Sequence, residues 1–412
     1  MRYVILLTAL LLGAAAWPAR AQRPPVPARL DLGGLYHPQR RPQAEVRREG
    51  DSLRLYLRLP DAGALRAGES LQLLGWAGYS ARVPLWQHTR VLRAADLRRE
   101  GAALWVELRV SAAALAPVRV LALWPARQLP DNPGAAAWLS LTPADLQRPY
   151  LLTDSLGQPL LRRYVRVGEP FGVAGYGPEQ ELTLRRYAAD FAPARPPHAR
   201  PAAPEPKART LRPDGEETLR PGQLVRLAGP GLYTVQPAAG GPALGLLAPD
   251  GDYPNLSTAQ ELIAPLRYLT TSEERARLEK AEVPKRAVDA FWLRAARDQP
   301  ETARLLIRRF YERVEDANQL FSAHKPGWMT DRGLLYIVLG PPERVVRSGA
   351  EEHWHYANTG YGSATYVLRA KPSTFAPDYY ELVRRPEYEP LWYAAVQQWR
   401  TGLNAPRAEA GR

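Results

Sequence analysis

The sequence predicts a multidomain, mainly β protein: two N-terminal β-sandwich-like domains, then a C-terminal α+β domain with helices packed on a small sheet. Three observations lead to this prediction. Short runs of alternating apolar and polar residues dominate the first 250 residues, with no long helical pattern between them. Amphipathic helical periodicity begins only after about residue 255. The length of 412 residues suits two to three domains.

Residues 1–21 have the features of a secretory signal peptide. A short positive start precedes the apolar run from Tyr3 to Trp17, and small residues stand at the spacing that a signal peptidase accepts. We expect cleavage between Ala21 and Gln22. The apolar run of 15 residues is shorter than the ~20 that a membrane-spanning helix needs, so we expect no transmembrane segment in the mature chain.

The chain contains no cysteine, which excludes a lipoprotein anchor, a disulfide and a cysteine nucleophile. We therefore expect an exported protein, either periplasmic or secreted, and peripheral attachment to the outer membrane stays open. The formal charge is +13, but 50 of the 55 basic residues are arginines that are spread over the whole chain. This profile indicates a compositional bias, so we expect no nucleic-acid partner. Weak binding to anionic glycans or lipid headgroups stays open.

The first predicted domain spans residues 22–127. The stretch "SLRLYLRLP", from Ser52, alternates leucines with polar residues, which predicts a half-buried strand. A polar run and the Gly50-Asp51 turn precede it, and together they predict a hairpin. The stretches "ALWVELRV" and "RVLALWP" predict further strands. Several short strands without an intervening helix favour a sandwich.

The second predicted domain spans residues 128–250. "YLLTDSLGQPLLRRYVRVG" predicts a hairpin around Gly157, whose return strand begins at Leu160 and Leu161. "QELTLRRY" and "GLYTVQP" predict two later strands. Between these strands lies a proline-rich insertion, residues 192–221, with few large apolar side chains. We expect it to be extended and mobile, with the strands on either side in one sheet system.

The third predicted domain spans residues 251–403 and is followed by a disordered tail, residues 404–412. Thr271 and Glu274 have the spacing of a capping box at a helix start. "VPKRAVDAFWLRAARD" and "PETARLLIRRFYERVEDANQLF" predict two amphipathic helices. Asn318 lies on the apolar stripe of the second one, where a polar side chain needs a partner, so we expect it to bond neighbouring backbone at the helix end.

A small sheet and a last helix complete the third predicted domain. "LLYIVLG", residues 334–340, is apolar on both faces, which predicts a central strand. "EEHWHYAN" and "SATYVLRA" are its expected neighbours in the sheet, and "EPLWYAAVQQWR" predicts the helix.

The stretch before the predicted central strand, "GWMTDRG", has residue types suited to a tight structural turn. Gly327 permits a left-handed conformation or a close backbone approach. Trp328 is a large amphipathic anchor. Thr330 and Asp331 can accept hydrogen bonds from the following amides. Arg332 can pair with Asp331 or with a carboxylate across the sheet, and we expect the strand to begin at Gly333.

The stretch "PGWMTDRGLLYIVLGPPERV" resembles the signature of the GWxTD domain, which is found in exported proteins of Gram-negative bacteria. "APLRYLTTSEE", "DAFWLRAA", "RRFYERVEDANQLF" and "EHWHYA" stand in the order and spacing of that family. The resemblance is close over about residues 255–385, and the preceding β regions resemble the N-terminal part of longer members. It implies an exported protein. It implies no catalytic residue and no cofactor, and we expect none.

Two chemical alternatives to a structural turn remain. Asp331, Glu343 and His353 are weak candidates for a hydrolytic site. On a strand, His353 and His355 point to one face, a spacing compatible with a metal ion, and the third ligand would be His324, Asp331 or Glu343. The chain has no serine-hydrolase elbow, zinc-protease helix motif or phosphate-binding glycine loop.

Three functions therefore compete. The first is a non-enzymatic scaffold or interaction module of the cell envelope, whose C-terminal domain binds another envelope protein. The second is an exported hydrolase with the candidate residues above. The third is a glycan-binding protein, because 11 Trp and 20 Tyr offer stacking platforms.

Overall fold

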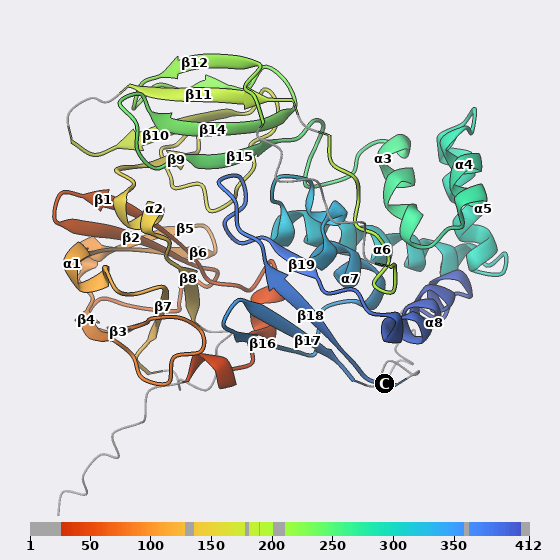
Figure 1. The fold of residues 1–412 in the computed structure, drawn as a ribbon, viewed down its shortest axis with the longest axis horizontal. Coiled ribbons are helices and arrows are strands. Elements are labelled where there is room, and N and C mark those ends of the chain that lie inside the picture. The colour runs from red at the N-terminus through yellow and green to blue at the C-terminus, as the bar shows by residue number, and fades with distance from the viewer. Residues whose placement is uncertain are drawn as a thin grey trace, which may run out of the picture.

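The structure is a computed structural model that describes residues 26–127, 136–177, 181–188, 190–200, 211–357 and 362–404. The predicted signal peptide, with its cleavage site at Ala21 and Gln22, lies outside the described residues, as does the predicted tail after Asn404. The described chain is mainly β, with five antiparallel sheets, and its longer helices gather in the C-terminal part (Figure 1). No helix within the described residues is long and apolar enough to cross a membrane.

The first β region contains two four-stranded sheets, with strand orders β1-β2-β6-β5 and β4-β3-β7-β8. Their strands are β1 (Gln43–Glu49), β2 (Ser52–Leu59), β3 (Ser70–Trp76), β4 (Trp86–Val91), β5 (Leu97–Glu100), β6 (Ala103–Ser111), β7 (Val120–Pro125) and β8 (Ala137–Ser140). The predicted β1–β2 hairpin is confirmed. The alternating leucines of β2 are buried in one apolar cluster with leucines of β3 and β7, so the two sheets share a core.

The second β region contains a three-stranded sheet, β13-β10-β9, and a four-stranded sheet, β12-β11-β14-β15. Its strands are β9 (Tyr150–Thr153), β10 (Pro170–Gly175), β11 (Leu182–Tyr187), β12 (Gly215–Leu219), β13 (Val225–Arg226), β14 (Gly231–Pro237) and β15 (Leu244–Ala248). The two sheets again share one apolar cluster. Because β11 pairs with β14, the strands on either side of the proline-rich segment lie in one sheet, as predicted.

Two predictions for the second region are wrong. Strand β9 pairs with β10, and the residues after Gly157 form no return strand but only two isolated bridges, Thr153 with Pro159 and Tyr164 with Leu247. The turn at Gly157 is present, since the amide of Leu160 donates to the carbonyl of Leu152 at 2.9 Å, but the pairing does not continue into a strand. The insertion 192–221 is not uniformly loose, because its end forms strand β12, paired with β11, and its beginning docks on the C-terminal domain. Residues 201–210 lie outside the described part of the chain.

The C-terminal region combines helices with the sheet β16-β17-β18-β19. Its helices and strands are α3 (Ala259–Ile263), η5 (Ala264–Tyr268), α4 (Ser272–Glu279), α5 (Pro284–Ala295), α6 (Pro300–Phe321), η6 (Gly327–Met329), α7 (Asp331–Leu339), β16 (Arg344–Ser348), β17 (Glu351–Tyr356), β18 (Ala364–Ala370), β19 (Tyr380–Leu382), η7 (Pro386–Tyr388) and α8 (Glu389–Arg400). The capping box of Thr271 and Glu274 is confirmed at the start of α4.

The predicted central strand over residues 334–340 is wrong, because this stretch is most of helix α7 and Gly333 lies in the first turn of that helix. Thr330 caps the helix, and Gly340, with a φ of 95°, ends it. The run is apolar on both faces because α6, α8 and β19 surround the helix. A continuous apolar run fits a buried helix as well as a buried strand, so periodicity alone does not separate them.

The largest apolar cluster joins the C-terminal region to the N-terminal part of the chain. Leu32 lies just before the short helix η2 (Gly33–Tyr36), and Tyr36 is its last residue. Both pack in this cluster with Trp76 of β3 and Trp124 of β7. The amide of Leu32 donates to the carbonyl of Val345 in β16 at 2.7 Å. The core of the C-terminal region is therefore completed by residues from the first 125 of the chain.

Candidate functional site

The GWMTD stretch forms a compact joint between α6 and α7. The short helix η6 leads into α7 through Thr330, whose hydroxyl donates to the carbonyl of Gly327 at 2.8 Å. The same hydroxyl accepts the amide of Gly333 at 3.0 Å, which caps the N-terminus of α7. A threonine at this position satisfies an amide that no helical carbonyl reaches.

Both glycines of the joint are required by close backbone contact. A Cβ on Gly327 would lie 1.9 Å from the carbonyl oxygen of Ala317 in α6. A Cβ on Gly333 would lie 2.0 Å from the carbonyl oxygen of Gly327. Neither glycine has a positive φ, so the reason for glycine here is the close approach of the chain segments.

Asn318 holds the joint against α6. Its side-chain oxygen accepts the amide of Trp328 at 3.0 Å, and its side-chain nitrogen donates to the carbonyl of Pro254 at 3.0 Å. Asn318 is fully buried, and Tyr253 beside it accepts the amide of Gly327 at 3.2 Å. The expectation that Asn318 bonds backbone is confirmed, although its partners lie in other segments and not at its own helix end.

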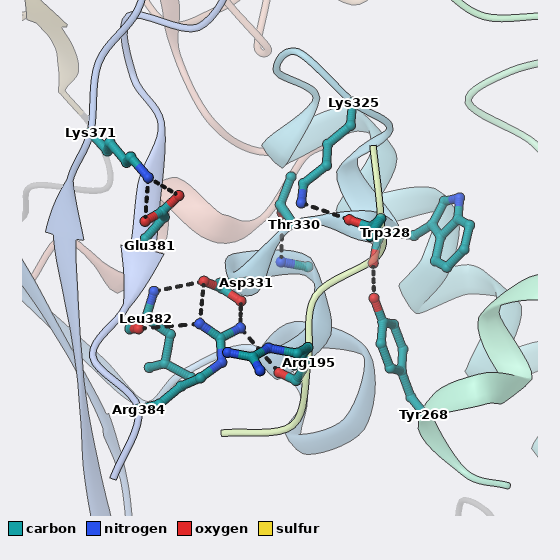
Figure 2. A network of polar contacts seen from close by, with 12 residues as sticks. Arg195, Tyr268, Lys325, Trp328, Thr330, Asp331, Lys371, Glu381, Leu382 and Arg384 are labelled. Carbon is teal, nitrogen blue, oxygen red and sulfur yellow. Dashed lines mark hydrogen bonds and ion pairs between the residues drawn. The ribbon is translucent and has the colours of Figure 1, made fainter. Parts of the chain in front are cut away.

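Asp331 is buried, and neighbouring groups compensate its charge (Figure 2). One carboxylate oxygen accepts the amide of Leu382 in β19 at 2.8 Å. The guanidinium of Arg384 donates to both carboxylate oxygens, at 2.5 and 3.3 Å. The side chain therefore ties the start of α7 to the last strand of the sheet and to the residue two positions beyond it.

Arg332 points away from Asp331 and is also buried. It contacts Asp378 through both the carboxylate and the backbone carbonyl, and its guanidinium lies over the rings of Phe321 and Tyr380. Burial by itself would lower the pKa of Arg332, but Asp378 and Glu352 raise it overall. Of the two partners expected for Arg332, the distant carboxylate is the observed one.

Trp328 is half-buried and lies on the outer side of the joint. Its ring meets Tyr268 edge-on at 6.1 Å between centroids, and its carbonyl accepts the Tyr268 hydroxyl at 2.8 Å (Figure 2). Trp328, Asn318 and His324 line a cavity of about 360 Å³ beside the joint. Trp328 therefore packs in the joint, as predicted, and also lines the cavity beside it.

The beginning of the proline-rich insertion runs across this surface. We call residues 190–198 the strap. Its backbone carbonyl at Ala192 accepts from Lys325 Nζ at 3.1 Å, and the amide of Ala194 donates to the carbonyl of Met329 at 2.9 Å. Farther along, Arg384 donates to the carbonyl of Arg195 at 3.2 Å (Figure 2). The amide of Arg385 donates to the carbonyl of Pro197 at 3.1 Å, so the joint binds the strap mainly through backbone groups.

His324 lies between the strap and the sheet. Its ring meets Phe191 of the strap and Tyr379, each at 4.6 Å between centroids. Burial lowers the pKa of His324 to about 4, and the nearby charges of Lys325 and Lys371 act in the same direction. The imidazole is therefore neutral at pH 7 and packs as an aromatic side chain.

The candidate hydrolytic residues have different surroundings. Asp331 is engaged with Leu382 and Arg384, whereas Glu343 is exposed in the loop before β16. His353 lies on β17 with its ring 3.4 Å from the Glu351 carboxylate. No contact among the three candidates is present within the described residues.

The predicted strand geometry of the two histidines is confirmed. Trp354 and Tyr356 are buried on one face of β17, and His353 and His355 lie half-buried on the other. His355 shares a hydrogen bond of 2.8 Å with Thr365, and burial lowers the pKa of His355. In the described ranges, no cluster of three or more His, Cys, Asp or Glu side chains is arranged to hold a metal ion.

The sequence reasoning missed the partners that complete the joint. Leu382 and Arg384 lie 51 and 53 residues after Asp331, and Asp378 lies 46 residues after Arg332. No spacing rule links them to the GWMTD stretch, since tertiary pairs are not periodic. The strap was missed because a proline-rich composition predicts the absence of a core and gives no information on docking.

In a comparison with models of protein families, residues 231–401 match the GWxTD domain. The matched range begins at β14, 20 residues before the predicted boundary at 251, and includes the whole joint. A search among curated proteins found no match to the chain.

Proposed function

Because residues 231–401 form a GWxTD domain, we propose that this chain is a non-enzymatic scaffold or interaction module of the cell envelope. In this proposal, the GWxTD domain binds another envelope protein. The apolar leader and the absence of cysteine support an exported protein without a lipid anchor, in the periplasm or secreted.

One observation carries the proposal: the face beside the joint already accepts an extended chain segment. The strap is bound through carbonyls and amides of residues that include Ala192, Ala194 and Pro197, so recognition depends little on its side chains. Recognition of an extended segment through its main-chain hydrogen bonds is a recurring mode of peptide binding. A partner segment of similar conformation suits the same face and the cavity beside Trp328.

The alternatives have less support. The polar groups of Thr330 and Asp331 are used within the domain, which leaves no free carboxylate at the joint for catalysis. Of the ten described tryptophans, seven are buried and Trp86, Trp138 and Trp328 are half-buried. Glycan-binding surfaces rely on exposed aromatic rings, so the high tryptophan count is better explained by core packing.

Site-specific photocrosslinking tests the proposal. A photoreactive side chain at Tyr393, which is 55% exposed and meets His198 of the strap, reports on the binding face. The same group at Val83, which is 70% exposed in the first β region, is the matched control. We expect a discrete crosslinked partner in the envelope fraction from position 393 alone. Equal products from both positions, or none, would contradict the proposal.

A second measurement separates the scaffold from the hydrolase. Glu343→Gln and His353→Ala alter side chains outside the core, so both variants should fold as the wild type does. A scaffold keeps its function in a complementation assay when both are combined. A stable double variant without function would favour the hydrolase.

A further inference from the structure

A second cavity lies where three parts of the chain meet, and Arg332 and Asp378 form part of its lining. It has a volume of about 270 Å³. Tyr36 and Arg41 come from the N-terminal segment before β1, Arg162 and Arg163 from the loop after β9, and Arg332 from α7. The size is below that of pockets for drug-sized ligands, so the cavity suits a small molecule or a single functional group.

The walls of this cavity are rich in arginine. Five arginines line it, against three carboxylates, Glu45, Asp145 and Asp378. Most of these charges are paired: Arg163 with Glu45, Arg162 with Glu169, and Arg347 with Glu352. Arg148, behind the wall, pairs with Glu45 and Asp145. Once the paired residues behind the wall are included, one positive charge remains in excess.

Arg41 supplies that excess. Within the described residues, its guanidinium has no hydrogen-bond or ion-pair partner. Burial lowers the pKa of Arg41 below its ordinary value, and the nearby charge of Arg332 acts in the same direction, whereas Asp378 opposes it. Arg41 is half-buried, and a cation that loses part of its hydration without gaining a counter-charge is unfavourable.

Arg332 has only a weak counter-ion. Its guanidinium is 3.5 Å from the Asp378 carboxylate, and the side chain of Asp378 is 58% exposed. An exposed carboxylate is screened by water and compensates a buried cation poorly. Arg41 and Arg332 therefore bring two incompletely compensated guanidinium groups to one cavity, with Asp378 the carboxylate that acts on both.

We propose that this cavity binds a small oxyanion, a molecule that presents a phosphate or carboxylate group to Arg41 and Arg332. Guanidinium groups donate paired hydrogen bonds in the geometry that these two anionic groups accept. The anion supplies the counter-charge that Arg41 lacks. Because the walls come from the N-terminal segment, the second β region and the GWxTD domain, binding also strengthens their association.

The test uses the full mature chain and measures its thermal midpoint against added inorganic phosphate or succinate, with ionic strength held constant by chloride. We expect a saturable rise in the midpoint with at least one of the two anions. A rise with phosphate alone would indicate a phosphate ligand, and a rise with succinate alone would indicate a carboxylate ligand. Chloride alone should give no saturable effect.

Arg41→Gln is the decisive variant, and Arg40→Gln is its matched control. Arg40 is the neighbouring residue and is exposed, and its substitution by glutamine removes the same charge. We expect anion binding at least about tenfold weaker in Arg41→Gln and unchanged in Arg40→Gln. Without anion, Arg41→Gln should be as stable as the wild type or more stable, since it removes an uncompensated, half-buried charge.

The proposal is overturned if neither anion gives saturable stabilisation, or if Arg41→Gln responds as the wild type does. Should Arg41→Gln fold poorly, Arg41→Lys takes its place, because lysine keeps the positive charge but lacks the paired donors of the guanidinium. Lysine should then weaken anion binding while the thermal midpoint without anion stays close to that of the wild type. Unaltered binding in that variant would also contradict the proposal.

Discussion

Two charges of this protein, the buried Asp331 and the half-buried Arg41, stand in different surroundings. At the joint, the Asp331 carboxylate is met by the amide of Leu382 and the guanidinium of Arg384. At the cavity lined by Arg41 and Arg332, which we call the junction cavity, the Arg41 guanidinium has no such partner within the described residues. A compensated charge contributes to folding, whereas an uncompensated one costs stability and favours a ligand. The comparison assigns a structural role to Asp331 of the GWMTD stretch and a binding role to the cavities around this stretch.

The largest expected effect tests whether the joint is as tightly packed as described. Gly327→Ala places a methyl group 1.9 Å from the Ala317 carbonyl oxygen, which cannot be relieved without moving α6. We expect a loss of more than about 4 kcal/mol in the free energy of unfolding of the C-terminal region. Chemical denaturation followed by tryptophan fluorescence measures it.

Gly78→Ala is the control for that substitution. A methyl group there meets nothing within 4 Å, and Gly78 has no positive φ. Its effect should stay within about 0.5 kcal/mol. A Gly327→Ala protein as stable as this control would show that the joint is loosely packed and would contradict the structural role of the GWMTD stretch.

Trp328→Ala should have an intermediate effect. A fully buried tryptophan replaced by alanine costs about 3–5 kcal/mol, but Trp328 is half-buried and its backbone bonds to Asn318 and Tyr268 remain. We expect a loss of about 2–3 kcal/mol, measured by urea denaturation. A change below 0.5 kcal/mol, together with lost partner binding, would assign Trp328 to recognition alone.

A smaller effect concerns pH and the strap. The pKa of His324 is about 4 in the folded protein and 6.5 in its unperturbed state, so the unfolded chain binds more protons between these values. Stability is therefore complete above pH 6.5 and is lost as the pH falls toward 4. Between pH 7.5 and pH 5 we expect His324 to account for a loss of at most about 2 kcal/mol.

His324→Gln should abolish this part of the pH dependence. Because His324 contacts Phe191, limited proteolysis within the strap should also become faster in the wild type at pH 5 than at pH 7.5. Identical pH profiles of the wild type and His324→Gln would contradict the role of this imidazole.

Local patterns explain which parts of the fold the sequence predicts. The leucines of β2 alternate along the strand, and Thr271 and Glu274 have capping-box spacing, so short-range rules are sufficient for both. Helix α7 was predicted as a strand because a helix surrounded by other elements loses its polar face. The apolar-polar periodicity that distinguishes an amphipathic helix from a strand is then absent.

The sites depend on contacts that no local pattern encodes. Arg384 reaches Asp331 from 53 residues away, and the strap reaches Met329 from another sheet system. The junction cavity requires Arg41, Arg162 and Arg332 to converge from three parts of the chain. Sequence reasoning identified Asn318 as a side chain that needs a partner and expected Asp331 to accept the following amides. The structure instead gives Asp331 the amide of Leu382 and the guanidinium of Arg384.

The most direct test of the central claim is a double-mutant cycle on Asp331 and Arg384. If Asp331 serves the joint, Asp331→Asn should cost about 3 kcal/mol, because it leaves Arg384 without its counter-charge. Arg384→Gln should be destabilising for the reciprocal reason. The double variant should lose less than the sum of the single losses by at least about 1 kcal/mol. Additive losses, or an Asp331→Asn protein that is as stable as the wild type yet fails in complementation, would contradict the structural assignment of the GWMTD stretch.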